Sequence, residues 1–248
     1  MLKDVSVEQQ AYIDSWLQDL VLESDDVGQF LTELAIFTTE SFSPSGSVVH
    51  CGVTLLRGRK AATAASSDDK AQAMDDVQNS FGEGPCLASM ELLSPVLVRD
   101  TAAEQRWPAY MKAVRSEGIR AILAVPLMVD GDTRAALNLY SEAVDGFSVQ
   151  DVERAESFAA HASKALRLAL KIAKLTEARN DLVAAMRSRT VIDIAIGVIM
   201  AQNRCSQDAA HSIMITASNN RNLKLRELAA TIVDSIAPES EVVTHFQE

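Results

Sequence analysis

The chain has 248 residues, of which 48% are hydrophobic and 23% are charged, and its formal net charge at pH 7 is −11. This length allows one large domain or two modest ones, and no apolar run approaches the ~18–20 residues that a membrane span requires. The acidic balance argues against general affinity for nucleic acid, because a negative surface repels a phosphate backbone.

The first ten residues, MLKDVSVEQQ, are polar and acidic and lack the basic and apolar stretches of a secretory signal. Cys51, Cys86 and Cys205 are odd in number and form no CxxC motif, so the spacing predicts neither a disulfide framework nor a zinc site. The histidines are scattered without a ligand pair. We therefore expect a cytoplasmic protein without a metal site.

The first half of the chain predicts two helices followed by a sheet. Residues 7–23 and 26–40 repeat apolar side chains at helical spacing. The stretches GSVVHCGVTLL and PVLVRD are short and β-branched, and AILAVPLMVDGDTRAALNLYS predicts two strands around a turn at 130–132. Helical stretches lie between them, near 68–79 and 107–115. The predicted class is α+β, with an antiparallel sheet flanked by helices.

One long helix or two nearly continuous helices should follow, because residues 148–203 contain no proline and a single glycine, Gly197. A helical glycine costs about 1 kcal/mol relative to alanine, so we expect a neighbouring helix to pack closely against it. Apolar residues in the middle of this segment alternate in steps of three and four, which is typical of a coiled-coil seam. The seam comprises Ala165, Leu168, Ile172, Leu175, Leu182 and Met186, with Arg179 as its one polar interruption. We expect a parallel homodimer joined along 148–186.

Residues 181–237 predict a bundle of three helices. Ser206 is a suitable N-cap for the second helix, SNNRN at 218–222 supplies the next turn, and the last helix should end before Pro238. An acidic tail follows at 238–248.

The predicted bundle concentrates basic side chains. In an up-down-up arrangement the second turn lies beside the start of the first helix. Arg187 and Arg189 would then approach Arg221, Lys224 and Arg226, while Arg204 lies at the opposite end. Such a cluster is a candidate phosphate-binding surface. On spacing alone, a solvated surface that pairs with Asp181, Asp193 and Glu227 explains these charges better.

The segment 182–233 resembles the ANTAR domain, a three-helix RNA-binding module of bacterial transcription antitermination regulators. The matching positions include Ala185, Ser188, Arg189, Ile192, Ala195, Gly197, Met200, Ser206, Ala209, Ala217, Asn222, Lys224, Leu225, Ala229 and Val233. The resemblance implies that paired domains of a homodimer bind two adjacent hairpin loops in nascent RNA and displace a terminator. We expect the six basic residues named above to form the RNA-binding site. Ile196 stands where many members have lysine, Ala210 where they have an aromatic residue and Met214 where arginine is frequent.

Residues 26–165 resemble a GAF domain, a sensor module for a small molecule or a redox signal. The resemblance rests on FGEGPCLASMELLSPVLVRD, on the Trp107-Pro108 helix and on the hairpin at 121–141; GAF before ANTAR is a familiar order in actinobacterial regulators. It implies a pocket over one face of the sheet. The candidate lining is Phe81, Glu83, Cys86, Trp107 and Tyr110, although core packing is the alternative for the aromatic residues. Gly82-Glu83-Gly84 predicts a tight turn before another helix.

These patterns predict an N-terminal helix at 1–25, a sensor at 26–165, a linker helix at 148–186 and an RNA-binding domain at 182–237. We expect a signal-responsive antiterminator that is not an enzyme and that recognises an unknown ligand or cofactor. One alternative is a GAF-based cysteine enzyme that reduces free methionine sulfoxide through Cys51 and Cys86, since GEGPC is similar to a Gly-x-Gly-x-Cys loop; buried, inert thiols are the simpler interpretation. Another is a protein-interaction regulator whose acidic N-terminal helices hold a partner kinase or phosphatase.

Overall fold

The computed structural model describes residues 2–43, 48–57, 60–129 and 133–236. The chain divides into two compact units, Met1–Ala173 and Lys174–Glu248. The turn predicted at 130–132 and the tail predicted at 238–248 lie outside the described residues. No helix in the described ranges is long and apolar enough to cross a membrane.

The first unit is built on an antiparallel sheet of five strands in the order β2-β1-β5-β4-β3. The strands are β1 (Val49–Arg57), β2 (Lys60–Ser66), β3 (Val96–Val98), β4 (Ala121–Leu127) and β5 (Thr133–Ser141). The central strand β5 pairs with β1 along its whole length and with β4 on its other side. The predicted α+β class and antiparallel sheet are confirmed.

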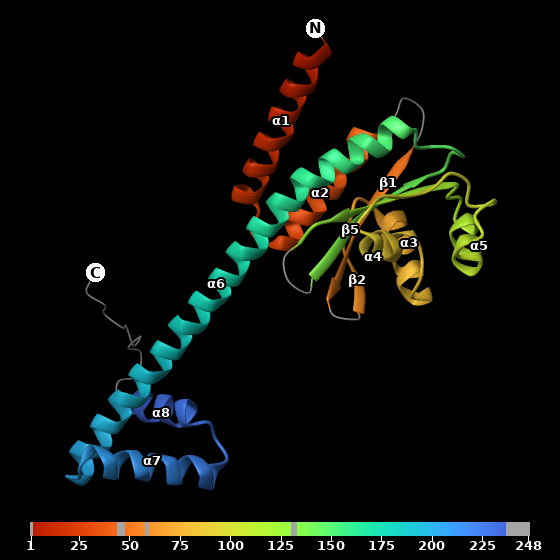
Figure 1. The fold of residues 1–248 in the computed structure, drawn as a ribbon. Helices are drawn as coiled ribbons and strands as arrows, with labels where there is room; N and C mark the ends of the chain where they lie inside the picture. The colour runs from red at the N-terminus through yellow and green to blue at the C-terminus, as the bar shows by residue number, and fades with distance from the viewer. Residues whose placement is uncertain (1, 44–47, 58–59, 130–132, 237–248) are drawn as a thin grey trace. The chain divides into compact units, whose positions relative to one another are not determined.

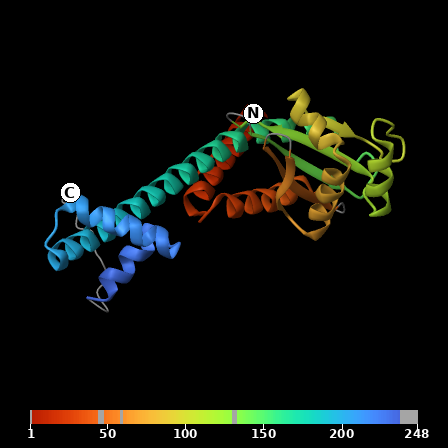
Figure 2. The same cartoon turned by 90° about the horizontal axis from the view of Figure 1, so that it is seen from below.

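Helices cover both faces of this sheet, as Figures 1 and 2 show. One face is covered by α2 (Val27–Phe42) and the first part of α6 (Val149–Asn203), with α1 (Leu2–Glu23) packed against them. The other face is covered by α3 (Asp69–Phe81), α4 (Pro85–Leu92) and α5 (Pro108–Ser116). Side chains therefore divide by alternation along β5: Leu137 and Leu139 join the first core, and Tyr140 joins the second.

Capping contacts explain where α6 begins and ends. The Ser148 amide donates to the Asp151 carboxylate at 2.9 Å, and the Asp151 amide donates to the Ser148 hydroxyl at 3.2 Å, which forms a reciprocal cap. At the other end Arg204 adopts a left-handed φ of 52°, and the Cys205 amide donates to the Met200 carbonyl at 3.3 Å. Between these caps α6 is one continuous helix of 55 residues, so the first of the two predicted arrangements is confirmed.

The second unit contains the rest of α6 together with α7 (Gln207–Arg221) and α8 (Leu225–Asp234). Its three helices share one small apolar core. The buried members are Ala195, Ile196, Ile199, Ala210, Met214, Ala229 and Val233. The predicted bundle of three helices is confirmed.

Candidate functional site

The second unit displays all six basic residues that the sequence selects, and each of them is exposed. Arg187 and Arg189 lie on α6, Arg204 lies in the turn between α6 and α7, and Arg221, Lys224 and Arg226 lie around the turn between α7 and α8. The two turns are at opposite ends of α7 (Figure 1). The approach of Arg187 and Arg189 to the second turn stays a prediction.

Hydrogen bonds order the backbone of the turn between α7 and α8. Asn222 adopts a left-handed φ of 52°, and the Ser218 hydroxyl donates to the Leu223 carbonyl at 2.6 Å. The Lys224 amide donates to the Glu227 carboxylate at 3.4 Å, at the start of α8. The basic side chains here are therefore exposed on a structured turn, a suitable arrangement for contacts with phosphate oxygens.

One acidic neighbour already contacts a basic residue of this set. The Arg189 Nε lies 3.8 Å from the Asp193 Oδ2, one helical turn further along α6. Both side chains are largely exposed, so this pair contributes little free energy and competes weakly with a phosphate. The pair fits the simpler interpretation of a solvated surface without excluding RNA at the same arginine.

The three departures from the ANTAR pattern lie inside the bundle. Ile196, Ala210 and Met214 are all buried in the core shared by α6, α7 and α8. Their apolar side chains therefore serve the packing of this unit. The six exposed cations are located at other positions, and the departures remove none of them.

The expectation for Gly197 is wrong within this chain. A Cβ at this position would meet no atom within 4 Å, and the residue is exposed. The packed side of α6 carries Ala195 and Ile199, each two residues away and hence on the opposite side of the helix. The cost of a helical glycine is not offset by a neighbouring helix of the same chain.

In the first unit, the predicted lining residues separate into buried and exposed members. Cys86 and Tyr110 are fully buried on the sheet face under α3, α4 and α5, and Trp107 is half-buried beside them. Glu83 and Phe81 are exposed, although the Phe81 ring still contacts Tyr110 edge-on, with centroids 6.4 Å apart. Tyr110 is surrounded by core residues, which agrees with the alternative that it serves packing.

The predicted turn beside Cys86 is confirmed. Gly82 ends α3 with a left-handed φ of 67°, and Gly84 precedes α4 with a φ of 144°. A Cβ on Gly84 would collide with the Gln78 side chain, whose Oε1 accepts a hydrogen bond of 3.2 Å from the Cys86 amide. The glycine therefore allows α3 and α4 to approach closely.

Sequence reasoning missed a buried polar cluster on this same face, centred on Asp75 of α3. The Asn138 amide donates to Asp75 at 2.8 Å, the Thr54 hydroxyl donates at 3.3 Å, and the Tyr140 hydroxyl also donates to this carboxylate. Burial raises the pKa of Asp75 to about 7, although these hydrogen bonds oppose the shift. A Cβ on Gly52 would collide with the carboxylate, so the glycine makes room for it.

The cluster retains polar atoms without a hydrogen-bond partner. They are the Tyr110 hydroxyl, the Asn138 Oδ1 and the Gln78 Nε2, all buried. Unpaired buried polar atoms are costly and are usually satisfied by ordered water or a ligand. This face of the sheet therefore has the chemistry to hold a small polar group. The described residues include no group of three or more side chains able to hold a metal ion.

The two cysteines of the first unit lie on opposite faces of the sheet. Cys51 belongs to the core under α2 and α6. Cys86 lies on α4, on the other face, where it packs against Ala124 of β4 and Ala136 of β5. Burial raises the pKa of Cys86 to about 12 and that of Cys51 far above its ordinary range. Since thiol chemistry requires a thiolate, this arrangement counts against the cysteine-enzyme alternative.

Two family models match the chain. The GAF domain matches residues 25–167, and the ANTAR domain matches residues 180–233. No curated protein matches the chain.

Several solved structures are similar to this chain at low identity. A transcription factor of the LuxR family from Burkholderia cenocepacia, described as N-acylhomoserine lactone dependent, has a TM-score of 0.51 at 13% identity, covering 66% of this chain and 96% of its own. A free methionine-R-sulfoxide reductase from Neisseria meningitidis, in complex with its substrate, gives 0.49 at 20%, covering 66% and 91%. The reduced form of the Staphylococcus aureus enzyme fRMsr gives 0.48 at 14%, covering 63% and 94%. At 13% identity, the likeness to the first of these structures shows the fold alone.

Proposed function

The chain belongs to the GAF domain family and carries an ANTAR domain, and from this premise we propose that it is a signal-responsive RNA-binding regulator that acts as a transcription antiterminator. Two copies would join along α6, and their ANTAR domains would bind two adjacent hairpin loops in nascent RNA. A ligand or redox change in the GAF domain would shift the equilibrium between arrangements of the paired α6 helices.

The observation that carries this proposal is the set of six exposed cations on the ANTAR domain. They lie within 187–226 of a chain whose net charge is −11. In an acidic protein, such a local basic surface is suited to a polyanion, because each phosphate that it neutralises releases counterions.

Pairing along α6 is supported by the exposure of its middle segment. Every residue from 171 to 185 is exposed, including Leu175 and Leu182, which are 62% and 61% accessible. An isolated helical segment of this length is marginal in water, and a second helix would cover its leucines. The first seam residue, Ala165, is instead buried in the core of its own chain, so the proposed seam begins at Leu168.

RNA binding can be tested with a transcript that carries two adjacent hairpin loops and is recovered by cross-linking to the purified protein. Affinity should fall with salt, with a log–log slope of about −0.7 per phosphate contacted on single strands. Arg189→Ala combined with Lys224→Ala should weaken binding whatever the loop sequence, since these side chains would contact phosphate and not bases.

The matched control is Lys112→Ala combined with Arg115→Ala, which removes the same charge from exposed positions of α5 in the first unit. It should leave RNA affinity unchanged. If the wild-type chain and both double variants bind the transcript equally poorly, the RNA assignment is lost.

A further inference from the structure

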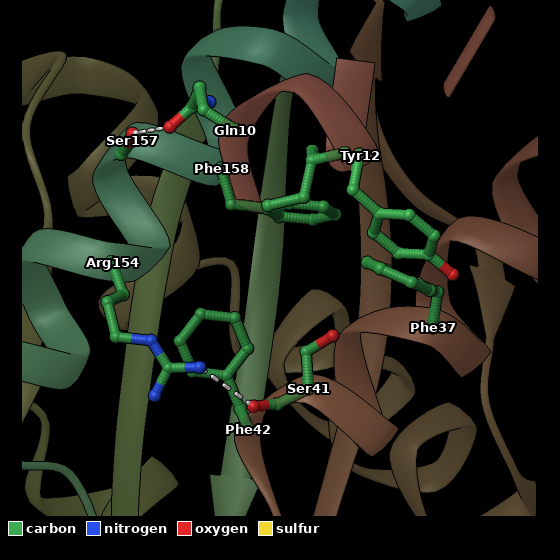
Figure 3. Close-up of a pocket in the computed structure, with 9 residues that line it drawn as sticks. Gln10, Tyr12, Phe37, Ser41, Phe42, Arg154, Ser157 and Phe158 are labelled. Atoms are coloured by element: carbon green, nitrogen blue, oxygen red, sulfur yellow. Dashed lines mark hydrogen bonds between the residues drawn. The ribbon is translucent and has the colours of Figure 1, made fainter. Parts of the chain in front are cut away.

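A pocket of about 390 Å³ lies between α1, α2 and α6, on the side of the sheet away from Asp75 (Figure 3). Its volume is within the range of small-molecule sites. All of its lining residues belong to the first unit. Three of them lie on α6, the helix that continues to Asn203.

The body of the pocket is aromatic. Phe42 and Phe158 line it with side chains that are only 6% and 4% exposed. Phe37 lies beside Phe158, with ring centroids 5.8 Å apart, and Trp16 stacks on Phe37 at 3.9 Å. These half-buried neighbours hold the rings in place, so the apolar surface is preformed.

The charged donor of the pocket is Arg154, and its hydrogen bonds restrict its position. Arg154 donates from Nη2 to the Ser41 carbonyl at 3.1 Å and from Nη1 to the Asp151 carboxylate at 3.3 Å, and its guanidinium lies 5.1 Å from the Phe42 ring centroid. Asp151 itself does not line the pocket. Arg154 is the one ionised side chain among the lining residues whose side chains are described.

A second donor is unpaired. Gln10 accepts a hydrogen bond from the Ser157 hydroxyl at 3.5 Å through its Oε1, which leaves its Nε2 buried without a partner (Figure 3). An unsatisfied buried donor carries a desolvation cost that a ligand acceptor would relieve. Among the side chains that the structure describes, the pocket thus combines a cation, a free donor and an apolar wall, and its lining there includes no carboxylate.

We propose that this pocket binds a small amphipathic monoanion, namely an aromatic or alicyclic carboxylate. Its ring would lie against Phe42 and Phe158, and its carboxylate would accept hydrogen bonds from Arg154 and Gln10. Because Arg154 and Phe158 are on α6, the ligand would act directly on the helix that leads into the ANTAR domain. The site is separate from the polar cluster around Asp75.

The probe pair for a test is phenylacetate and phenylacetamide, which share a shape and differ in charge. In the full chain carrying Trp107→Phe, Trp16 is the remaining tryptophan, and its stacking on Phe37 makes its emission a local reporter. Phenylacetate should change this emission saturably, and phenylacetamide should require at least a ten-fold higher concentration. Arg154→Gln should reduce the phenylacetate response to the phenylacetamide level.

Two further variants complete the design. Lys171→Gln removes an exposed charge from α6 outside the pocket and should leave both titrations unchanged. Ser157→Phe should abolish both responses by filling the pocket, with circular dichroism to verify folding. Equal responses to the two probes, or no effect of Arg154→Gln, would overturn the proposal. A third outcome would also overturn it: neither probe alters Trp16 emission, and Ser157→Phe converts a dimer to single chains. The pocket would then be a contact with a second copy of the chain.

Discussion

Asp75 is a carboxyl group that burial keeps largely protonated in mildly acidic solution, below neutral pH. Its pKa rises from 3.8 to about 7 in the folded chain. Between these values the folded state binds a proton that the unfolded state releases. The free energy of unfolding must therefore fall as pH rises from about 4 to about 7, and level off above that.

Asp75→Asn should remove this pH dependence while keeping a hydrogen-bonding side chain under the sheet. The slope that disappears should approach 1.4 kcal/mol per pH unit, the value for one proton. Urea unfolding at a series of pH values measures it. Asp69→Asn, at an exposed position of the same helix, is the control and should keep the wild-type slope. A slope that survives in Asp75→Asn would show that another group titrates.

At this scale, the sequence leads to the sheet face that carries the buried polar cluster, but not to Asp75 at the centre of that cluster. Cys86 and Tyr110 are predicted and lie on the expected face. Asp75 escapes prediction because it belongs to a polar helical stretch, in which an inward carboxylate cannot be told from the exposed Asp76. Two features of the sequence could have indicated the cluster: Asn138 within an apolar strand, and Gly52 on the strand that pairs with it. They can be related to Asp75 only when the register between β1 and β5 is known.

Among the elements, α6 has an exposed apolar surface that a partner helix would cover. Leu168, Ile172, Leu175 and Leu182 are all exposed, and they repeat in the steps expected of a coiled-coil seam. Covering a leucine side chain contributes about 1.5–3 kcal/mol. Pairing of two α6 helices is the arrangement that would cover all four together.

Leu175→Asp combined with Leu182→Asp should convert the proposed dimer to single chains, because each substitution places a charge inside the paired seam. Sedimentation equilibrium over a range of concentrations measures the change, and we expect at least a hundred-fold weaker association. Ala184→Asp adds a charge to the same exposed stretch, two residues from Leu182 and so on the opposite side of the helix. If this control dissociates the dimer equally, the seam is misassigned.

The elements were predictable where a periodic pattern is long, and less so where it is short. The absence of proline from 148–203 predicts a long helical segment, but it does not decide between one helix and two. Strand β2, with the sequence KAATAAS, was not predicted, because alanine has a low strand propensity. The segment forms a strand through its pairing with β1. Gly197 was misinterpreted because spacing does not show which side of α6 the bundle covers.

For the whole molecule, the proposed account joins two units through one helix. The first unit offers a buried polar cluster and an aromatic pocket, and the second offers exposed cations around two turns. A ligand in the first unit can influence RNA binding only if it has different affinities for two arrangements of the α6 pair. The sequence predicts the order of these parts, while the position of the aromatic pocket depends on how α1 packs against α2 and α6.

The central claim is that two copies of the chain act together on one RNA. The most direct test is the mass of the complex, by light scattering after size exclusion, with an RNA that carries two adjacent hairpin loops. We predict two chains per RNA, and a markedly weaker complex when one of the two loops is deleted. A single chain bound per RNA, with equal affinity for one loop and for two, would contradict the account.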